Sequence, residues 1–233
     1  MLFNSLEFVV FFAILFILYR WVLNGKTKAQ NFLLLAASYV FYGYVDWKIL
    51  PLLILSTVLF YGLGMAISTA KTARRNSLYS TLGVVFGIAV LGYFKYTNFF
   101  IGSFQELFEH LGFQVHRYTF QIGVPVGISF YTFRLLSYVI DVHRGKYEPT
   151  RDFTVFATYV AFFPSILSGP IDRPNTLIPQ LQKPHMFDYP LFVDGLRQIL
   201  WGMFKKMVIA DQCAVVVNAV FADPAQYSGS TLV

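Results

Sequence analysis

Long apolar segments recur along this chain, with only short polar segments between them. The first four cover residues 6–23, 31–45, 49–68 and 78–94. A helix that crosses the hydrocarbon core of a bilayer needs about 20 mainly apolar residues. In lipid every backbone polar group must find its partner within the protein, so segments of this kind are expected to be helices. The sequence therefore predicts an all-α, polytopic membrane protein with several transmembrane helices.

The charged residues fit this prediction better than they fit a soluble protein. Only 13% of the chain is charged, whereas a soluble domain carries roughly 25%. The formal net charge of +6 comes from basic residues in short loops, so orientation in the membrane explains it and no nucleic-acid partner is expected. If the four spans alternate, Lys26 and Lys28 lie on the same side as Lys71, Arg74 and Arg75. The positive-inside rule then predicts that both loops are cytoplasmic and the N-terminus is outside.

The metal-binding and disulfide-forming residue types show no functional pattern. Cys213 is the only cysteine, which excludes an internal disulfide framework. The four histidines, His110, His116, His143 and His185, have no metal-ligand spacing with each other or with that cysteine. No metal site is expected.

One predicted membrane helix, residues 120–142, carries charge inside its apolar sequence. A charge at the centre of a bilayer costs at least about 2.5–3.5 kcal/mol on insertion scales. At helical spacing one face holds Gly127, Tyr131, Arg134, Tyr138 and Asp141. We expect this polar stripe to line a water-filled path rather than face lipid. Arg134 and Asp141 lie two turns apart, so each is expected to have another partner. The structural alternative is a buried charge that only locks two helices together.

Three further segments are expected to depart from simple spans. Residues 96–111 are amphipathic and suit the outer membrane interface. Residues 153–167 form a short apolar segment that reaches Pro164 and leads into the Pro/Gly-rich residues 168–174. It is either a re-entrant helix covered by protein or an ordinary helix end at the surface.

Residues 177–190 are expected to form a loop and residues 191–222 one long helix or two. In the last, Lys205 and Lys206 would contact either the phosphates of an acyl donor or phospholipid head groups.

Three stretches of the chain resemble the membrane-bound O-acyltransferase family, in its alginate O-acetyltransferase-like branch, which is related to the D-alanyl transfer protein of teichoic acid synthesis. They are the opening residues 1–5, residues 125–146 (PVGISFYTFRLLSYVIDVHRGK), and residues 162–173 (FFPSILSGPIDR) followed by residues 202–206 (GMFKK). The resemblance covers essentially the whole chain. It departs from the usual pattern at His143, where tyrosine is common, and at Ser165, where glutamine is frequent.

The resemblance implies a ring of tilted helices around a funnel through the bacterial inner membrane. An acyl group, in the first place acetyl from acetyl-CoA, would pass from the cytoplasm to an extracytoplasmic polysaccharide in the cell envelope. No bound cofactor is implied, and a second, extracytoplasmic acetyltransferase-like protein is an expected partner beside membrane lipid. Ser168 and Arg173 join Arg134 as candidates for lining the funnel. Replacing Arg134 with leucine is then expected to lower acyl transfer while leaving insertion largely intact.

The catalytic residue of the family lies outside this sequence. Family members are about twice as long, and their catalytic histidine is in the second half; none of the four histidines here matches it. We therefore expect residues 1–233 to be the N-terminal part of a single membrane domain that transfers no acyl group alone. Two other classes stay open: a membrane transport or scaffold subunit, and a non-catalytic member of the family. A histidine between apolar spans downstream of Val233 would favour the enzyme.

Overall fold

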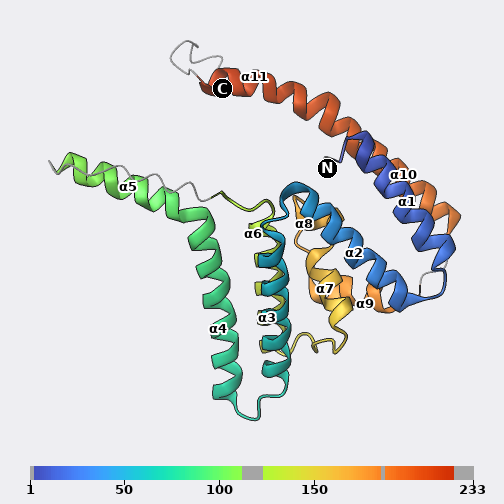
Figure 1. Cartoon of the computed structure of the whole chain (residues 1–233), viewed down its shortest axis with the longest axis horizontal. Coiled ribbons are helices and arrows are strands. Elements are labelled where there is room, and N and C mark those ends of the chain that lie inside the picture. Colours follow the sequence, from blue (N-terminus) through green and yellow to red (C-terminus); the bar gives the residue numbers. More distant parts are fainter. Residues whose placement is uncertain (1–2, 112–122, 185–186, 223–233) are drawn as a thin grey trace. The chain divides into compact units, whose positions relative to one another are not determined.

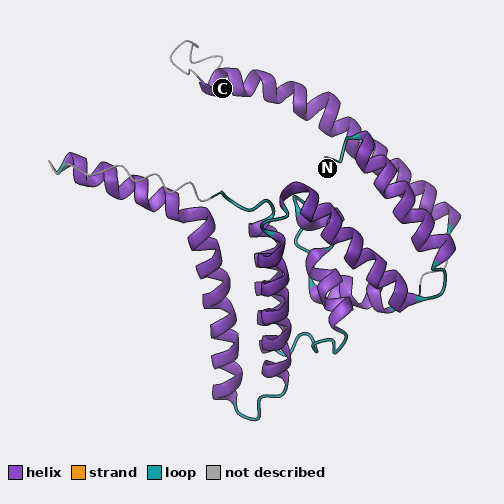
Figure 2. Cartoon of the chain, viewed as in Figure 1, coloured by secondary structure: helices purple, strands orange, loops and turns teal. Residues whose placement is uncertain are grey.

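The computed structural model describes residues 3–111, 123–184 and 187–222, and these residues form helices with no strand among them (Figure 2). The all-α fold class is therefore confirmed. Three short π-helical segments, η1 to η3, interrupt or extend the α-helices. In chain order the elements are α1 Leu6–Ile17, η1 Leu18–Val22, α2 Thr27–Asp46, α3 Leu50–Ser68, α4 Ala73–Leu91, η2 Gly92–Tyr96, α5 Thr97–His110, α6 Ile128–His143, α7 Phe153–Ala161, α8 Phe163–Ile166, α9 Pro174–Gln182, α10 Tyr189–Phe204, η3 Lys205–Ala210 and α11 Asp211–Ala222.

The helices fall into two compact units. The larger unit comprises Glu7–Pro184, and the smaller one is made chiefly of α10, η3 and α11. The prediction of a single membrane domain over residues 1–233 stays a prediction.

All four predicted spans are helical. Two helical runs are long and apolar enough to cross a membrane by length and composition, Leu50–Ser68 and Ala73–His110. The second run joins α4 to the predicted interfacial segment α5 through η2, and Figure 1 shows the helix axis turning there. A membrane protein is thus supported, whereas the number of crossings and the interfacial position of α5 stay predictions.

Helix α6 begins later than its apolar sequence predicts. The sequence favours a helix over residues 120–142, but α6 runs from Ile128 to His143; residues 120–122 lie outside the described residues. The reason is Gly127, whose φ of 75° is left-handed and ends the irregular segment before the helix. A Cβ at this glycine would lie 2.6 Å from the carbonyl oxygen of Ile166. Gly127 therefore permits the close backbone contact between α6 and α8.

The apolar face of α6 is buried as well as its polar stripe. Leu136 and Val139 pack against α4 at Gly87 and Gly83, where an added Cβ would lie 2.8 Å and 3.2 Å from those side chains. On α3, a Cβ at Gly64 would lie 2.3 Å from the hydroxyl of the stripe residue Tyr138. The glycines of two helices thus let α6 sit in close contact with both, while Phe133 stays about half exposed.

The structure of the C-terminal third differs from one expectation, the loop before residue 190, and decides between one helix and two after it. The sequence favours a loop over residues 177–190, but residues 174–182 form α9. A proline at the first helical position costs nothing, so Pro174 starts the helix. The side-chain amide of Asn31 then fixes its end by donating to the carbonyl of Leu181 at 2.7 Å. Residues 189–222 form one continuous helical run in which η3 separates α10 from α11.

Candidate functional site

Helix α7 ends inside the protein. Asp152 caps its N-terminus by accepting hydrogen bonds from the N–H groups of Thr154 and Val155. At the other end, Phe162 leaves the helical conformation with ψ of 105°, and the residues that follow are largely buried. Irregular backbone is tolerated at membrane depth only where protein or water covers it. Here protein covers it, which fits the re-entrant alternative; the depth of this break in a bilayer stays a prediction.

The end of α7 leaves carbonyl groups that the helix cannot satisfy. The carbonyl of Val160 would need an N–H at position 164, where Pro164 has none. The carbonyl of Tyr159 would need the N–H of Phe163, but that group donates instead to the hydroxyl of Ser38 on α2, at 3.2 Å. Two buried acceptors therefore face the neighbouring helix without a backbone partner.

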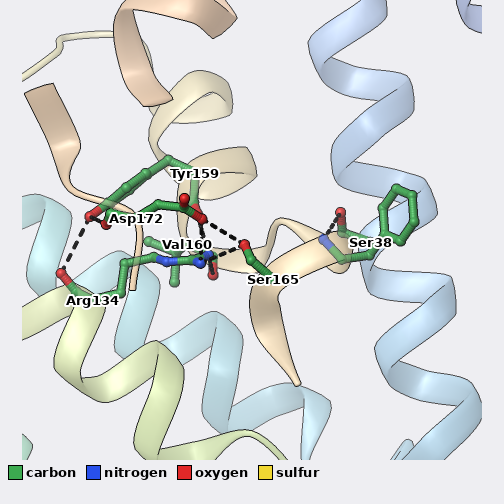
Figure 3. A network of polar contacts seen from close by, with 7 residues as sticks. Ser38, Arg134, Tyr159, Val160, Ser165 and Asp172 are labelled. Atoms are coloured by element: carbon green, nitrogen blue, oxygen red, sulfur yellow. Dashed lines mark hydrogen bonds and ion pairs between the residues drawn. The ribbon is translucent and has the colours of Figure 1, made fainter. Parts of the chain in front are cut away.

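Arg134 of α6 supplies the missing donors (Figure 3). One terminal nitrogen, Nη1, donates to the carbonyl of Tyr159 at 2.9 Å and to that of Val160 at 3.1 Å. The other, Nη2, donates to Ser165 Oγ at 2.6 Å and to Asp172 Oδ2 at 2.9 Å. The arginine is only 1% exposed. Its positive charge also lies at the negative end of the α7 dipole, where a cation is stabilised.

Asp172, Ser165 and Tyr159 close the network around this guanidinium. Ser165 Oγ donates to Asp172 Oδ2 at 2.7 Å, and the Tyr159 hydroxyl donates to the Asp172 carbonyl at 3.0 Å. The Tyr159 ring centre lies 5.6 Å from the guanidinium carbon of Arg134, within cation–π range. We call these four residues the Arg134 network. It joins the two central motifs of the sequence, since Arg134 lies in one and Ser165 and Asp172 lie in the other.

The predicted stripe residues are placed as follows. Tyr131, Arg134, Tyr138 and Asp141 are all buried. The two tyrosine hydroxyls have no hydrogen-bond partner within the part of the chain that the structure describes. Arg134 pairs with Asp172, whereas Asp141 faces Arg173 at 3.8 Å. The prediction that Arg134 and Asp141 have different partners is confirmed. That these residues line a funnel stays a prediction.

The other candidates lie at the surface of their units. Ser168 and Arg173 are exposed, and the serine takes no part in the Arg134 network. In the smaller unit, Lys205 and Lys206 are exposed within η3. Lys205 lies 5.3 Å over the ring of Trp201, and Lys206 pairs with Asp211. Binding of an acyl donor by these lysines stays a prediction. Among residues 3–111, 123–184 and 187–222, no group of three or more His, Cys, Asp or Glu could hold a metal ion.

Sequence reasoning missed Asp172, Ser165 and Tyr159 as members of the site. A buried arginine needs a carboxylate nearby, and Asp172 is the acid in the motif that follows the broken helix. That requirement could have identified Asp172 in place of its neighbour Arg173. Nothing in the sequence singles out Tyr159. It takes part in the site through its backbone carbonyl, and every residue has a backbone carbonyl.

The chain is similar to curated acyltransferases. It is 39% identical over 226 residues to the "Probable alginate O-acetylase AlgI" of Pseudomonas aeruginosa, a match that covers 95% of this chain and 42% of that protein. It is 29% identical over 243 residues to the "Peptidoglycan O-acetyltransferase" of Helicobacter pylori, covering 92% of this chain and 45% of that protein. It is 27% identical over 143 residues to the "Teichoic acid D-alanyltransferase" of Lacticaseibacillus rhamnosus, covering 60% and 31%.

The chain spans less than half the length of these curated relatives. No family model matches the sequence. No solved structure matches it.

Proposed function

We propose that the chain forms part of an O-acetyltransferase of the bacterial inner membrane, in the membrane-bound O-acyltransferase family that its sequence resembles; its similarity to the named O-acetylating relatives over 92–95% of its length supports this. The acceptor is a polysaccharide of the cell envelope, as the names of two relatives suggest. The acetyl donor is a cytoplasmic thioester, acetyl-CoA. In the overall reaction the thioester C–S bond breaks, an ester forms at a sugar hydroxyl, and the hydroxyl proton and the thiolate leave as free CoA.

The observation that carries this proposal is the position of the Arg134 network. Three of its four members, Arg134, Ser165 and Asp172, come from the two sequence motifs that carry the family resemblance, and they meet around a buried positive charge at a helix break. Such groups are costly in an apolar protein and are retained where a polar path or a fixed geometry is needed. The network holds α6, α7 and the segment 165–172 in one arrangement, and so would fix the wall of the path that the acetyl group follows.

We place the donor on the cytoplasmic side of the membrane because one end of the larger unit is basic. His143 at the end of α6 contacts Asn76 in the first turn of α4. The loops that precede α4 and follow α6 therefore lie at the same end. Basic side chains gather in this region, namely Lys71, Arg74, Arg75, Arg144, Lys146 and Arg151. Positive charge favours the cytoplasmic side, which supports the orientation with the N-terminus outside.

A chimera tests the proposed function. The matching part of the Pseudomonas aeruginosa relative is replaced by residues 1–233 of this chain, in a strain that lacks that relative's gene. Ester-linked acetate per mass of secreted alginate is then measured. We expect the chimera to restore acetylation, and Asp172→Asn in the chimera to reduce it. Phe133→Leu, on the exposed side of the same α6, is the matched control and should leave acetylation unchanged.

The experiment also bears on the donor and on the alternatives. Acetyl content no higher than in the deletion strain, with the chimera present in the membrane, would contradict an acyltransferase role and favour a scaffold. In membranes from the active chimera, Lys205→Gln together with Lys206→Gln should raise the KM for acetyl-CoA if these lysines contact the donor phosphates. Lys183→Gln, which removes an exposed lysine elsewhere, is the control for the change in charge.

A further inference from the structure

An apolar groove lies between α2 and the helix formed by α1 and η1. Its volume is about 260 Å³, and every side chain that lines it is apolar. Ile14 and Leu18 line one wall, and Leu33, Ala36 and Ala37 line the other. These positions recur every three or four residues on both helices, so the groove follows the seam of the first helical hairpin.

The groove is built into the hairpin, because the two helices are joined at each end. Near the turn, the side-chain amide of Gln30 donates to the carbonyl of Tyr19 at 3.1 Å. At the other end, the ring of Phe11 on α1 lies 6.1 Å from that of Phe41 on α2. Between these contacts α2 presents Ala36 and Ala37, which are too small to fill the space.

Water is a poor occupant of this space. A bound water needs about two to four polar partners, and every side chain that lines this groove is apolar. An unfilled groove would leave its lining without dispersion contacts on one side. In a membrane protein the apolar molecule at hand is a lipid chain.

We propose that the groove holds one acyl chain of an anionic phospholipid whose head group lies at the α1–α2 turn. The turn end of the groove is marked by Leu18 and Leu33. Lys26 and Lys28 are exposed at the same turn. Lys28 precedes Leu33 by five residues, which is about 7.5 Å along a helix, within reach of a head group. The charge of these lysines selects an anionic lipid over a zwitterionic one and over an apolar protein segment.

The test uses the unchanged chain first. It is placed in nanodiscs of phosphatidylglycerol and phosphatidylcholine in equal parts, with a trace of phosphatidylglycerol that carries a photoreactive diazirine in one acyl chain. After illumination the labelled peptides are identified by mass spectrometry. We expect label concentrated at the groove residues of α1 and α2. Label spread evenly over all exposed helices would show surrounding lipid only and would overturn the proposal.

Variants then separate the groove from the lysines. Native mass spectrometry from the same nanodiscs counts retained lipid. Ala36→Leu fills the groove and should lower retained phosphatidylglycerol at least about threefold, since the chain loses its contacts. Ala89→Leu, the same change at an exposed position on α4, should leave it unchanged. Lys26→Gln with Lys28→Gln should lower the preference for phosphatidylglycerol about fivefold or more.

Each result decides the proposal. Equal retention by Ala36→Leu and the unchanged chain would overturn it, as would equal loss from Ala36→Leu and Ala89→Leu. If Ala36→Leu fails to fold, the photolabel on the unchanged chain and the lysine variant still decide, because neither alters the groove. A preference for phosphatidylglycerol that survives the lysine changes would refute the assignment of the head group.

Discussion

Replacing Arg134 with leucine should destabilise the larger unit as well as lower its contribution to acyl transfer. The change removes the donors for two carbonyls at the end of α7, for Ser165 Oγ and for Asp172 Oδ2. Sequence reasoning alone predicts a loss of activity with normal insertion. The four acceptors change that expectation, because a leucine leaves them buried or half-buried beside an apolar side chain.

The magnitude follows from what is left unpaired. Removing one partner of a buried ion pair costs about 3–5 kcal/mol, and a buried acceptor without a donor costs about 1–3 kcal/mol. Asp172 is 27% exposed, so water recovers part of its loss. We therefore take the cost of the broken ion pair alone, about 3–5 kcal/mol, as the total loss in the free energy of unfolding. This loss corresponds to a fall in Tm of roughly 6–20 °C for a unit of this size.

The assay is thermal unfolding in detergent. Unfolding is measured as the loss of the monodisperse peak of a fluorescent fusion in size-exclusion chromatography. Phe133→Leu lies on the same helix but is about half exposed, and should change the free energy of unfolding by about 0.5 kcal/mol or less. The double variant Arg134→Leu/Asp172→Leu should recover about 1–3 kcal/mol relative to the sum of the single changes, because no carboxylate is left without its partner.

Two results would refute this reasoning. One is a Tm for Arg134→Leu that matches that of Phe133→Leu. The other is additivity of the Arg134 and Asp172 changes, which would show that the two side chains do not interact in the folded protein.

Three further predictions follow from the packing, the caps and the loops. Gly64→Ala should cost about 1–3 kcal/mol, because its Cβ would overlap a tyrosine hydroxyl on α6, whereas Gly62→Ala meets no atom within 4 Å and should be neutral or stabilising in the same unfolding assay. Asp152→Ala should cost about 0.5–2 kcal/mol through loss of the α7 cap, and Asp152→Ser should restore most of it. In a chain whose native cysteine is replaced, a cysteine at Ser77 should resist an impermeant thiol reagent in whole cells and one at Asp46 should react; the reverse would refute the orientation.

The sequence by itself determined the secondary structure of the spans and the residues that had to be sheltered from lipid. Apolar length and the need to satisfy backbone groups predict the helices α1 to α4. The cost of charge in hydrocarbon identifies Arg134 and Asp141 as buried, and their separation of two turns predicts that they have different partners. Each of these conclusions depends on one segment and its solvent, so no tertiary contact is needed to reach it.

Tertiary structure decided which groups form hydrogen bonds and an ion pair with Arg134. Arg134 bonds to the end of α7, about 25 residues further along the chain, and to Asp172, 38 residues away. Two of its acceptors are backbone carbonyls, which have no signature in a sequence. They are free only because Pro164 has no N–H and because Ser38, on a distant helix, takes the N–H of Phe163. The start of α6 at Ile128 depends likewise on how closely Gly127 approaches Ile166, a contact between segments that sequence periodicity does not bring together.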